Sequence, residues 1–305
     1  MRILVTGASG LLGLNLGLRF ASEQEITGVV YSHSFSHLPF PVIAVDLSDE
    51  KNTGKLIEQS KPDVVINCAA MANLEDCEKK PLEAHLLNGE FPGWLAEKCE
   101  RHSIKLVHIS TDAVFDGTKN GKYSETDIPH PLSVYAQSKL AGELAVRQID
   151  QCALVLRVNF YGFSPSGQRS LAEFFLRNLE NGTSIKGFTD VFFSPLYVID
   201  LVEYLMHCVE KELAGLYHLC SSESLSKYDF GLRIARVFNL NGDLISPITV
   251  SDVDFMRAPR SKNLVLDAGK IEQALARPTP SQDDGLARFY HDFQDGYAKR
   301  LQTLI

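Results

Sequence analysis

The chain has 305 residues with 45% hydrophobic and 22% charged residues, the composition of a soluble globular protein, and its formal net charge is −8. The acidic balance disfavours a general affinity for nucleic acid or anionic lipid, so no partner of either kind is expected. No apolar run approaches the roughly 18 residues of a membrane span and no signal peptide precedes the first apolar run, so a cytoplasmic protein is expected.

The first half of the chain alternates short β-branched runs with longer segments of helical period. Such alternation, with strands apolar on both faces, predicts a parallel sheet covered by helices on each side, which is a doubly wound α/β fold. Later segments are less regular and predict a smaller second lobe. The expected strands are 2–7, 26–31, 41–46, 63–70, 105–110 and 152–158, then short ones near 216–220 and 247–250; helices are expected over 11–22, 52–60, 83–102, 170–181, 198–211, 226–238 and 282–304.

A glycine-rich turn follows the first strand. The stretch "VTGASGLLG" places Gly7, Gly10 and Gly13 three apart at the start of a predicted helix. Glycine permits a tight turn and a close approach of backbone N–H groups to a pyrophosphate, which a helix N-terminus also favours. The turn, including Ser9, Leu11 and Leu12, is therefore a candidate dinucleotide site; the alternative is a turn that only packs helix on strand.

The end of the second strand bears on the choice of dinucleotide. Sites that prefer NAD usually carry an acid about 20 residues beyond the glycines, bonded to the adenine ribose. Here the stretch "VVYSHSFS" offers Ser32 and His33 and no carboxylate. NADP(H) is therefore favoured as the cofactor, and NAD(H) stays possible because no arginine is present to bind the extra phosphate.

"YAQSK" places Tyr135 and Lys139 four residues apart on a predicted helix, where they share a face. A nearby ammonium stabilises a phenolate, so Lys139 is expected to lower the pKa of Tyr135. Thr111 ends a preceding strand at the carboxyl edge of the sheet, where open α/β sheets bind ligands. Together they suit proton transfer to a carbonyl beside a nicotinamide. The alternative for the pair alone is a solvated helix face.

With these motifs in order, the sequence resembles the extended short-chain dehydrogenases/reductases over nearly its whole length. The matching stretches are "ILVTGASGLLG", "VDLSD", "NCAA", "STDAVFDG", "YSETDIPHPLSVYAQSKLAGE", "LRVNFYG", "GLYHLCSSES" and "RSKNLVLD". The likeness is to the branch of dTDP-4-dehydrorhamnose reductases and methionine adenosyltransferase β subunits. It implies a Rossmann-like doubly wound parallel sheet over residues 1–160, which would bind NAD(P), and a smaller C-terminal substrate-binding lobe over 161–305, with the chain free to cross between lobes.

The resemblance also implies roles for individual residues. Thr111, Tyr135 and Lys139 take the catalytic positions, and Lys139 also holds the nicotinamide ribose. The other candidate cofactor-binding residues are Asp46, Leu47, Ala69, Ala70 and Asn88. For Asp46 a helix cap remains an equal alternative, and for the two alanines the alternative is a role as small core residues.

On the substrate side, Asp112, Asn159, Arg257 and Arg260 are the candidates. Guanidinium groups suit a diphosphate, although a solvated basic loop is an equal alternative for the two arginines. Ala113 stands where the reductases carry tyrosine, which suggests a site reshaped for another ligand. No metal site is expected, because no acidic cluster has ligand spacing.

These features predict an NADP(H)-dependent oxidoreductase acting on a keto group of a sugar, most simply a nucleotide-sugar such as a dTDP-4-keto-6-deoxyhexose, in a possible homodimer. One alternative is a cofactor-binding regulatory subunit resembling the methionine adenosyltransferase β subunit. Another is a nucleotide-sugar epimerase or dehydratase with tightly bound NAD.

Overall fold

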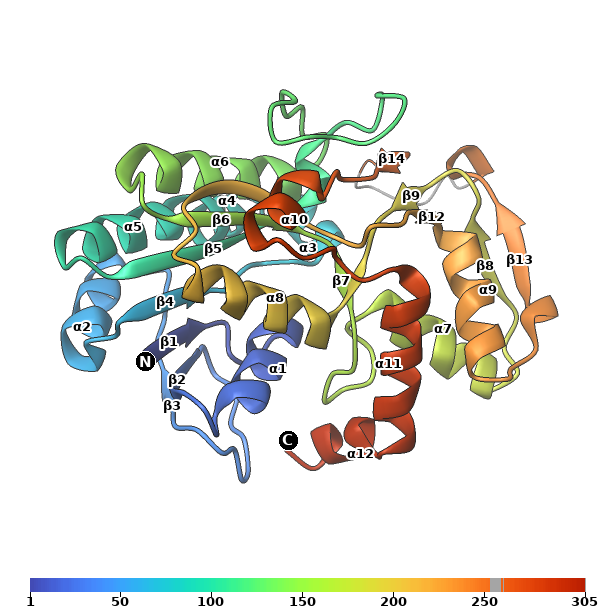
Figure 1. Cartoon of the computed structure of the whole chain (residues 1–305), viewed down its shortest axis with the longest axis horizontal. Helices are drawn as coiled ribbons and strands as arrows, with labels where there is room; N and C mark the ends of the chain where they lie inside the picture. The colour runs from blue at the N-terminus through green and yellow to red at the C-terminus, as the bar shows by residue number, and fades with distance from the viewer. Residues whose placement is uncertain (253–258, 260, 305) are drawn as a thin grey trace.

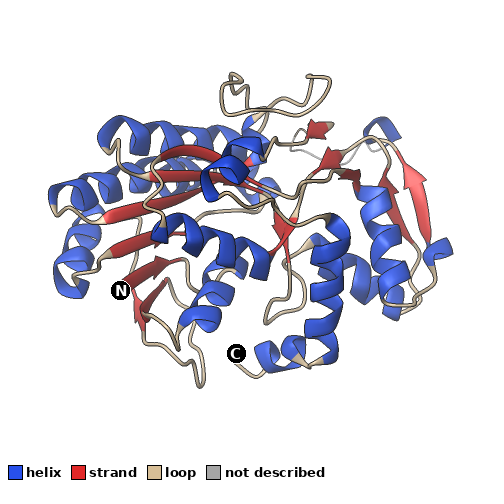
Figure 2. Ribbon diagram, viewed as in Figure 1, coloured by secondary structure: helices blue, strands red, loops and turns tan. Residues whose placement is uncertain are grey.

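A seven-stranded parallel sheet forms the centre of the protein, whose computed structural model describes residues 1–252, 259 and 261–304. The strand order is β11-β6-β5-β4-β1-β2-β3, with every neighbouring pair parallel (Figures 1 and 2). Its first six strands have the order of a Rossmann sheet, so the predicted fold class is confirmed. The strands are β1 (Arg2–Thr6), β2 (Glu25–Val30), β3 (Val42–Ala44), β4 (Val64–Asn67), β5 (Lys105–Thr111), β6 (Leu154–Val158) and β11 (Gly215–Leu219).

Helices cover both faces of this sheet because successive strand residues point to opposite sides. Leu4 belongs to the core beneath the helices α2 (Glu50–Ser60), α5 (Phe91–Arg101) and α6 (Val134–Ile149). Ile3 and Val5 belong to the core on the other face, under α1 (Leu11–Phe20) and α8 (Val198–Glu210). Figure 1 shows these two layers on either side of the strands. The near-continuous apolar strands of the sequence thus reflect burial on both faces.

Three short helical segments connect β4 to α5: α3 (Leu74–Lys79), α4 (Pro81–His85) and the π-helix η1 (Leu86–Glu90). A π-turn inserts an extra residue into a helix and often occurs at functional sites. Here η1 packs closely on α6, since a Cβ at Gly142 would lie 2.1 Å from the Asn88 carbonyl oxygen. The glycine in "KLAGE" therefore allows α6 to approach the π-turn.

The remaining elements form the smaller part of the molecule, at the right of Figure 1. Its helices α7 (Leu171–Glu180) and α9 (Lys227–Val237) pack together, and α9 contacts the parallel strands β8 (Ile185–Phe188) and β13 (Ile245–Ile248). The other elements are η2 (Asp112–Val114), β7 (Phe160–Tyr161), β9 (Phe192–Phe193), β10 (Leu196–Tyr197), β12 (Leu225–Ser226), η3 (Gly242–Leu244), η4 (Val250–Asp252), β14 (Asn263–Leu264), α10 (Gly269–Leu275), α11 (Gln282–Gln294) and α12 (Tyr297–Gln302).

One strand differs from the prediction. The segment near 216–220 was expected in the smaller lobe, but β11 pairs in parallel with β6 and extends the large sheet. The preceding helix α8 likewise packs on α1. The chain therefore returns to the large sheet after residue 160. The division of the chain at that residue stays a prediction.

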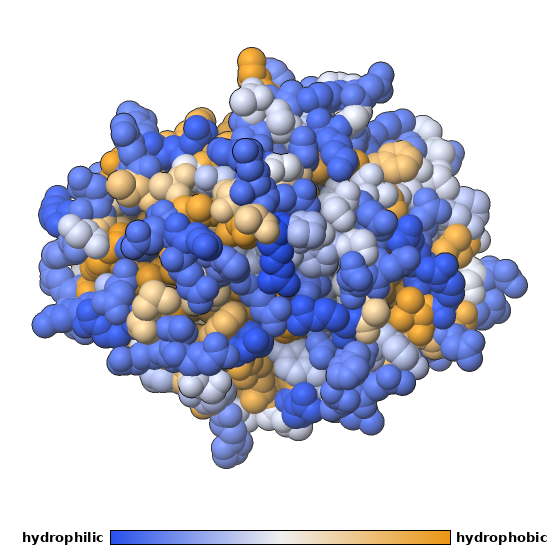
Figure 3. All heavy atoms as spheres, in the orientation of Figure 1, coloured by the Kyte–Doolittle hydropathy of each residue, from blue (hydrophilic) through white to orange (hydrophobic). Residues whose placement is uncertain are grey.

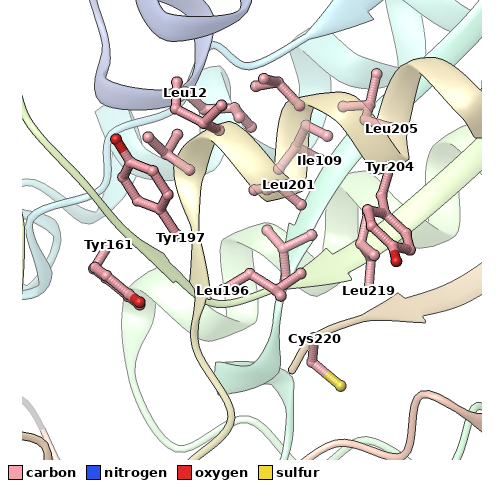
Figure 4. Close-up of a cluster of buried hydrophobic side chains, with 14 of the residues drawn as sticks. Leu12, Ile109, Tyr161, Leu196, Tyr197, Leu201, Tyr204, Leu205, Leu219 and Cys220 are labelled. Carbon is pink, nitrogen blue, oxygen red and sulfur yellow. The ribbon is translucent and has the colours of Figure 1, made fainter. Parts of the chain in front are cut away.

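A single hydrophobic cluster runs from the large sheet into the smaller part. Figure 4 shows Leu12 of α1, Ile109 of β5 and Leu201 of α8 beside Leu196 and Tyr197 of β10. The same cluster continues into α7, α9 and α11. The two parts of the molecule are therefore joined by shared side-chain packing.

The surface is largely hydrophilic on the face drawn in Figure 3, with small hydrophobic patches between charged side chains. Among the described residues, no helix combines the length and apolar character needed to cross a bilayer.

Candidate active site

The glycine turn joins β1 to α1 at the carboxyl edge of the sheet. Gly7 has a φ of +65°, and a Cβ there would lie 2.7 Å from the backbone nitrogen of Ala69. A Cβ at Gly13 would lie 2.6 Å from the Gly7 carbonyl oxygen. Gly10 precedes the first helical residue, and no side chain caps this end of α1. The first N–H groups of the ten-residue helix α1 are thus available to an anion, which fits a pyrophosphate.

Two connected cavities lie on either side of this turn. The first, of about 780 Å³, is lined by Gly10, Leu11, Leu12 and Gly13 together with the catalytic candidates. The second, of about 610 Å³, extends past the ends of β2 and β3 and includes Ala70, which lines both cavities. Because both are lined by Ala70, the two cavities adjoin, and together they are called the cleft here. The candidate residues on the second cavity are Gly7, Ser9, Asp46, Leu47, Ala69 and Ala70.

Asp46 does not cap the following helix, so that alternative was wrong. The N-cap of α2 is Asp49, whose side chain accepts a hydrogen bond from the Lys51 N–H. Asp46 instead accepts bonds from the backbone N–H and the hydroxyl of Ser48, which lower its pKa. Ser32 and His33 follow β2 as exposed residues and do not line the cavity. Their contact with a cofactor stays a prediction.

Asn88 is buried and uses its amide to hold neighbouring backbone. Its Oδ1 accepts from the Met71 N–H at 2.8 Å, and its Nδ2 donates to the Met71 carbonyl oxygen and the Ser138 hydroxyl, both at 3.0 Å. It thereby fixes the segment after β4 against α6. This geometry gives Asn88 a positioning role beneath the cleft, and direct contact with a cofactor stays a prediction.

Thr111, Tyr135 and Lys139 converge on the first cavity, as the resemblance implied. Thr111 ends β5, and it lines the same two cavities as the half-buried Tyr135. Ser133 caps α6 by accepting from the Ala136 N–H, which begins the helix just before Tyr135. Lys139 is buried, and its Nζ donates to the Ile109 carbonyl oxygen at 2.5 Å. Their catalytic roles remain predictions.

The expected electrostatic coupling between Tyr135 and Lys139 is not seen in this structure. Burial raises the pKa of Tyr135 to about 12; the neighbouring Thr111 side chain opposes this rise, and Asp112 and Cys77 add to it. Burial likewise lowers the pKa of Lys139 to about 8, while Cys68 and Glu143 raise it. For both side chains, the free-energy cost of burying the charged form, the phenolate or the ammonium, thus outweighs the stabilisation that neighbouring groups give to that form.

A smaller cavity of about 230 Å³ opens from the same catalytic candidates toward the smaller part of the molecule. Thr111, Tyr135, Asp112 and Asn159 line it, with Lys227 at the start of α9. Burial raises the pKa of Asp112 to about 6, although bonds from Asn159 and Thr111 oppose the rise. This cavity is the candidate substrate site. Arg257 and Arg260 lie outside the described residues.

Comparison with known proteins decides the family. The family model described as the RmlD substrate binding domain matches residues 1–295. The chain belongs to this family of extended short-chain dehydrogenases/reductases. These are NAD(P)-dependent enzymes, so the predictions of an oxidoreductase class and a nucleotide cofactor are confirmed at that level.

Relatives within the RmlD family differ in their described activities. A probable low-salt glycan biosynthesis reductase Agl14 of Haloferax volcanii is 34% identical over 97% of this chain and 99% of its own length. The dTDP-4-dehydrorhamnose reductase of Aggregatibacter actinomycetemcomitans is 32% identical, covering 90% and 92%. The methionine adenosyltransferase 2 subunit beta of Xenopus laevis is also 32% identical, covering 92% and 84%.

Solved structures show the same RmlD-type architecture. The Bacillus anthracis dTDP-4-dehydrorhamnose reductase in complex with NADP has a TM-score of 0.83 at 25% identity, covering 95% of this chain and 98% of that one. A Thermus thermophilus UDP-glucose 4-epimerase with NAD has a TM-score of 0.80 at 22% identity, covering 96% and 99%, and shares the fold alone. A bound dinucleotide thus occurs on this fold in both NADP and NAD forms.

Three residues that line the candidate site were not predicted from the sequence. Gln168 and Arg169 line the first cavity, which is the candidate dinucleotide cavity, and Lys227 lines the smaller one, which is the candidate substrate cavity. Each belongs to a segment after residue 160 that has no motif of its own. The capping pattern "SLAE" after Arg169 predicts the start of α7 but gives no sign that this start lies beside the glycine turn.

Metal ligands do not cluster in the described part of the chain, where no group of three or more His, Cys, Asp and Glu side chains has suitable geometry. His33 and His37 are four residues apart, but they lie in the loop after β2, where helical spacing does not bring them together.

Proposed function

We propose that the protein is an NADP(H)-dependent reductase of a keto group in a nucleotide-linked sugar, with Thr111, Tyr135 and Lys139 as its catalytic residues. One observation supports this above the others. Thr111 and Tyr135 line both the dinucleotide cavity and the smaller cavity beside it. A carbonyl bound in the smaller cavity would therefore lie between these hydroxyl groups and the cofactor.

The chain's own residues have distinct tasks in this proposal. The Thr111 hydroxyl orients the substrate carbonyl, and Tyr135 donates the proton that converts the oxygen to a hydroxyl. Burial raises the pKa of this phenol to about 12, so at neutral pH Tyr135 carries the proton that the reduction would consume. Lys139 binds the ribose next to the nicotinamide. The dinucleotide, when bound, supplies the hydride.

The substrate cavity supports a sugar over an apolar ketone. Its lining includes the Asp112 carboxylate and the Asn159 amide, and the amide donates a hydrogen bond to the carboxylate at 2.5 Å. Carboxylate and amide groups suit hydroxyl groups of a sugar ring. We take a dTDP-4-keto-6-deoxyhexose as the first substrate to test, because a relative at 32% identity is described as dTDP-4-dehydrorhamnose reductase. Arg257 and Arg260 are proposed for its diphosphate.

The decisive experiment follows NADPH oxidation with a panel of nucleotide-linked 4-keto sugars, and repeats it with NADH. We expect turnover with at least one sugar and a preference for NADPH. Tyr135→Phe should lower kcat at least about a hundredfold, the usual range for loss of a general acid. A Tyr135→Phe enzyme with unchanged kcat would refute the assigned role.

A regulatory subunit is the second candidate, supported by the Xenopus laevis relative at 32% identity. In that case the cleft would bind a dinucleotide to stabilise a complex with a partner protein. The outcome that favours it is a stoichiometric partner recovered with the protein, together with no turnover over the whole sugar panel. An epimerase or dehydratase would instead retain NAD through purification without oxidising added NADPH.

Four further features predicted from the sequence remain predictions. They are the NAD(P)-binding unit over 1–160, the substrate-binding lobe over 161–305, a cytoplasmic location and a homodimer.

A further inference from the structure

Arg169 lies directly beside the glycine turn, although 155 residues separate it from Gly13 in the chain. Its Nη1 donates a hydrogen bond to the Ser9 carbonyl oxygen at 2.5 Å. The same residue lines the dinucleotide cavity together with Gly10 and Lys139. The smaller part of the molecule therefore contributes a cation to the mouth of the cofactor cleft.

The backbone around Arg169 is firmly held. The buried carboxylate of Glu173 accepts hydrogen bonds from the N–H groups of Ser164, Arg169 and Ser170, at 2.5, 2.8 and 3.1 Å. The Ser170 hydroxyl also donates to the Gly162 carbonyl oxygen at 2.7 Å. One buried acid thus fixes both ends of the 164–170 segment. The position of Arg169 at the cleft is consequently built into the fold.

The charged residues that line the cavity indicate what the Arg169 guanidinium could bind. Among the described residues that line the dinucleotide cavity, the cations are Lys139 and Arg169, and the acid is Glu75. Lys139 is buried at the catalytic end, whereas Arg169 is exposed beside the glycine turn. Guanidinium has five N–H donors and binds phosphate in a bidentate fashion. In the described part of the chain, one donor of Arg169 bonds Ser9, and the guanidinium makes no ion pair with an acid.

We propose that Arg169 binds the pyrophosphate of the dinucleotide beside the N-terminus of α1. The glycine turn supplies N–H groups and Arg169 supplies the positive charge. This inference depends on a dinucleotide cofactor and is independent of which sugar is reduced. It also explains how cofactor binding would join the small lobe to the large sheet, because Arg169 immediately precedes α7.

A simpler role for Arg169 is a tether that holds its loop on the Ser9 carbonyl, and three substitutions separate the two roles. Arg169→Gln keeps a donor for Ser9 but removes the charge, Arg169→Lys keeps the charge without the fork, and Arg169→Ala removes both. Arg101→Gln is the matched control, because this exposed arginine ends α5 at the opposite edge of the sheet. Binding of NADPH and NADH to the full-length protein is measured by calorimetry at low and high salt.

For a pyrophosphate contact we expect Arg169→Ala and Arg169→Gln to weaken dinucleotide binding alike, by about ten- to a hundredfold. Arg169→Lys should lie between them and the wild type, and Arg101→Gln should bind as the wild type does. The difference should shrink at high salt, which screens exposed charge. An Arg169→Gln protein that binds like the wild type would overturn the proposal and establish the tether. Wild-type binding by all three variants would overturn it as well.

Discussion

Lys139 is subject to two opposing influences in the free protein. Burial lowers its pKa to about 8, so its ammonium form is only moderately favoured at neutral pH. Its single hydrogen bond from Nζ in the described residues goes to the neutral Ile109 carbonyl oxygen, which holds the side chain without fully compensating its charge. A polyanionic dinucleotide favours the charged form, so binding is expected to raise this pKa.

A pH dependence of cofactor binding follows. About one unit or more below pH 8 the lysine is already mostly protonated, and binding takes up little proton at this site. Above pH 8 the neutral lysine must gain a proton, so the dissociation constant should rise by up to about tenfold per pH unit until the pKa of the complex is reached. Calorimetric titrations between pH 7 and 10 would measure this rise, with Lys139→Met as the control.

Lys139→Met should bind the dinucleotide more weakly at pH 7, with a shallower dependence above pH 8. If the wild type showed a flat profile over the same range, Lys139 would not be the group that titrates on binding. An identical slope in the wild type and in Lys139→Met would assign the proton to another side chain.

At the scale of single elements, α6 is placed by a buried ion pair beneath the catalytic face. Glu143, one turn beyond Lys139, accepts from the Arg157 Nη2 at 2.6 Å and Nε at 2.9 Å, and from the Ser110 hydroxyl at 3.0 Å. The Arg157 guanidinium also lies 5.0 Å from the centre of the Phe115 ring. This network connects α6 to β5 and β6, so it sets where Tyr135 and Lys139 stand relative to Thr111.

Removing one partner of this pair should be costly. Arg157→Met leaves the Glu143 carboxylate buried without its cation, which typically costs about 3–5 kcal/mol of unfolding free energy. The natural control is Arg147→Met, because Arg147 approaches Glu143 at 3.8 Å with a side chain that is 44% exposed. Because Arg147 is partly exposed and farther from Glu143 than Arg157 is, its removal should cost less than the removal of Arg157.

Urea unfolding of the two variants would measure these free energies. Equal losses for Arg157→Met and Arg147→Met would show that the buried pair does not stabilise α6. A double variant, Arg157→Met with Glu143→Leu, should recover part of the loss, since it also removes the unpaired charge.

The helices and strands were largely predictable from the local sequence pattern, whereas the elements against which each one packs were not. Periodicity located the six strands up to β6 and the main helices, and the spacing of Tyr135 and Lys139 placed both side chains on one cleft. Period alone cannot give the partner of a short strand, so β11 was predicted in the smaller lobe although it pairs with β6 of the large sheet. Arg169 and Lys227 reach the cleft through tertiary packing, which leaves no mark in the spacing of nearby residues.

At the scale of the whole molecule, cofactor cleft and substrate cavity share a wall but draw on different parts of the chain. The glycine turn and β5 belong to the first half, whereas Lys227 and Arg169 come from the second. The C-terminal segment also returns to the first half: the Tyr297 hydroxyl donates to Asn15 of α1, and the Ser36 N–H donates to the Leu304 carbonyl oxygen. Binding at the cleft therefore involves both halves.

This arrangement predicts how a fragment of residues 1–160 behaves. Such a fragment lacks β11, which leaves the backbone of β6 as an open sheet edge, and it lacks α8, which leaves the α1 face of the sheet uncovered. Exposed edges and apolar faces promote aggregation. The loss of packing should exceed the roughly 5–15 kcal/mol that stabilises a typical domain. We expect the fragment to aggregate or to unfold without cooperativity, whereas the full chain should unfold in one transition that NADPH shifts upward. A soluble fragment with a sharp thermal transition and wild-type affinity for NADPH would contradict this view and show that the first 160 residues form an independent dinucleotide-binding domain.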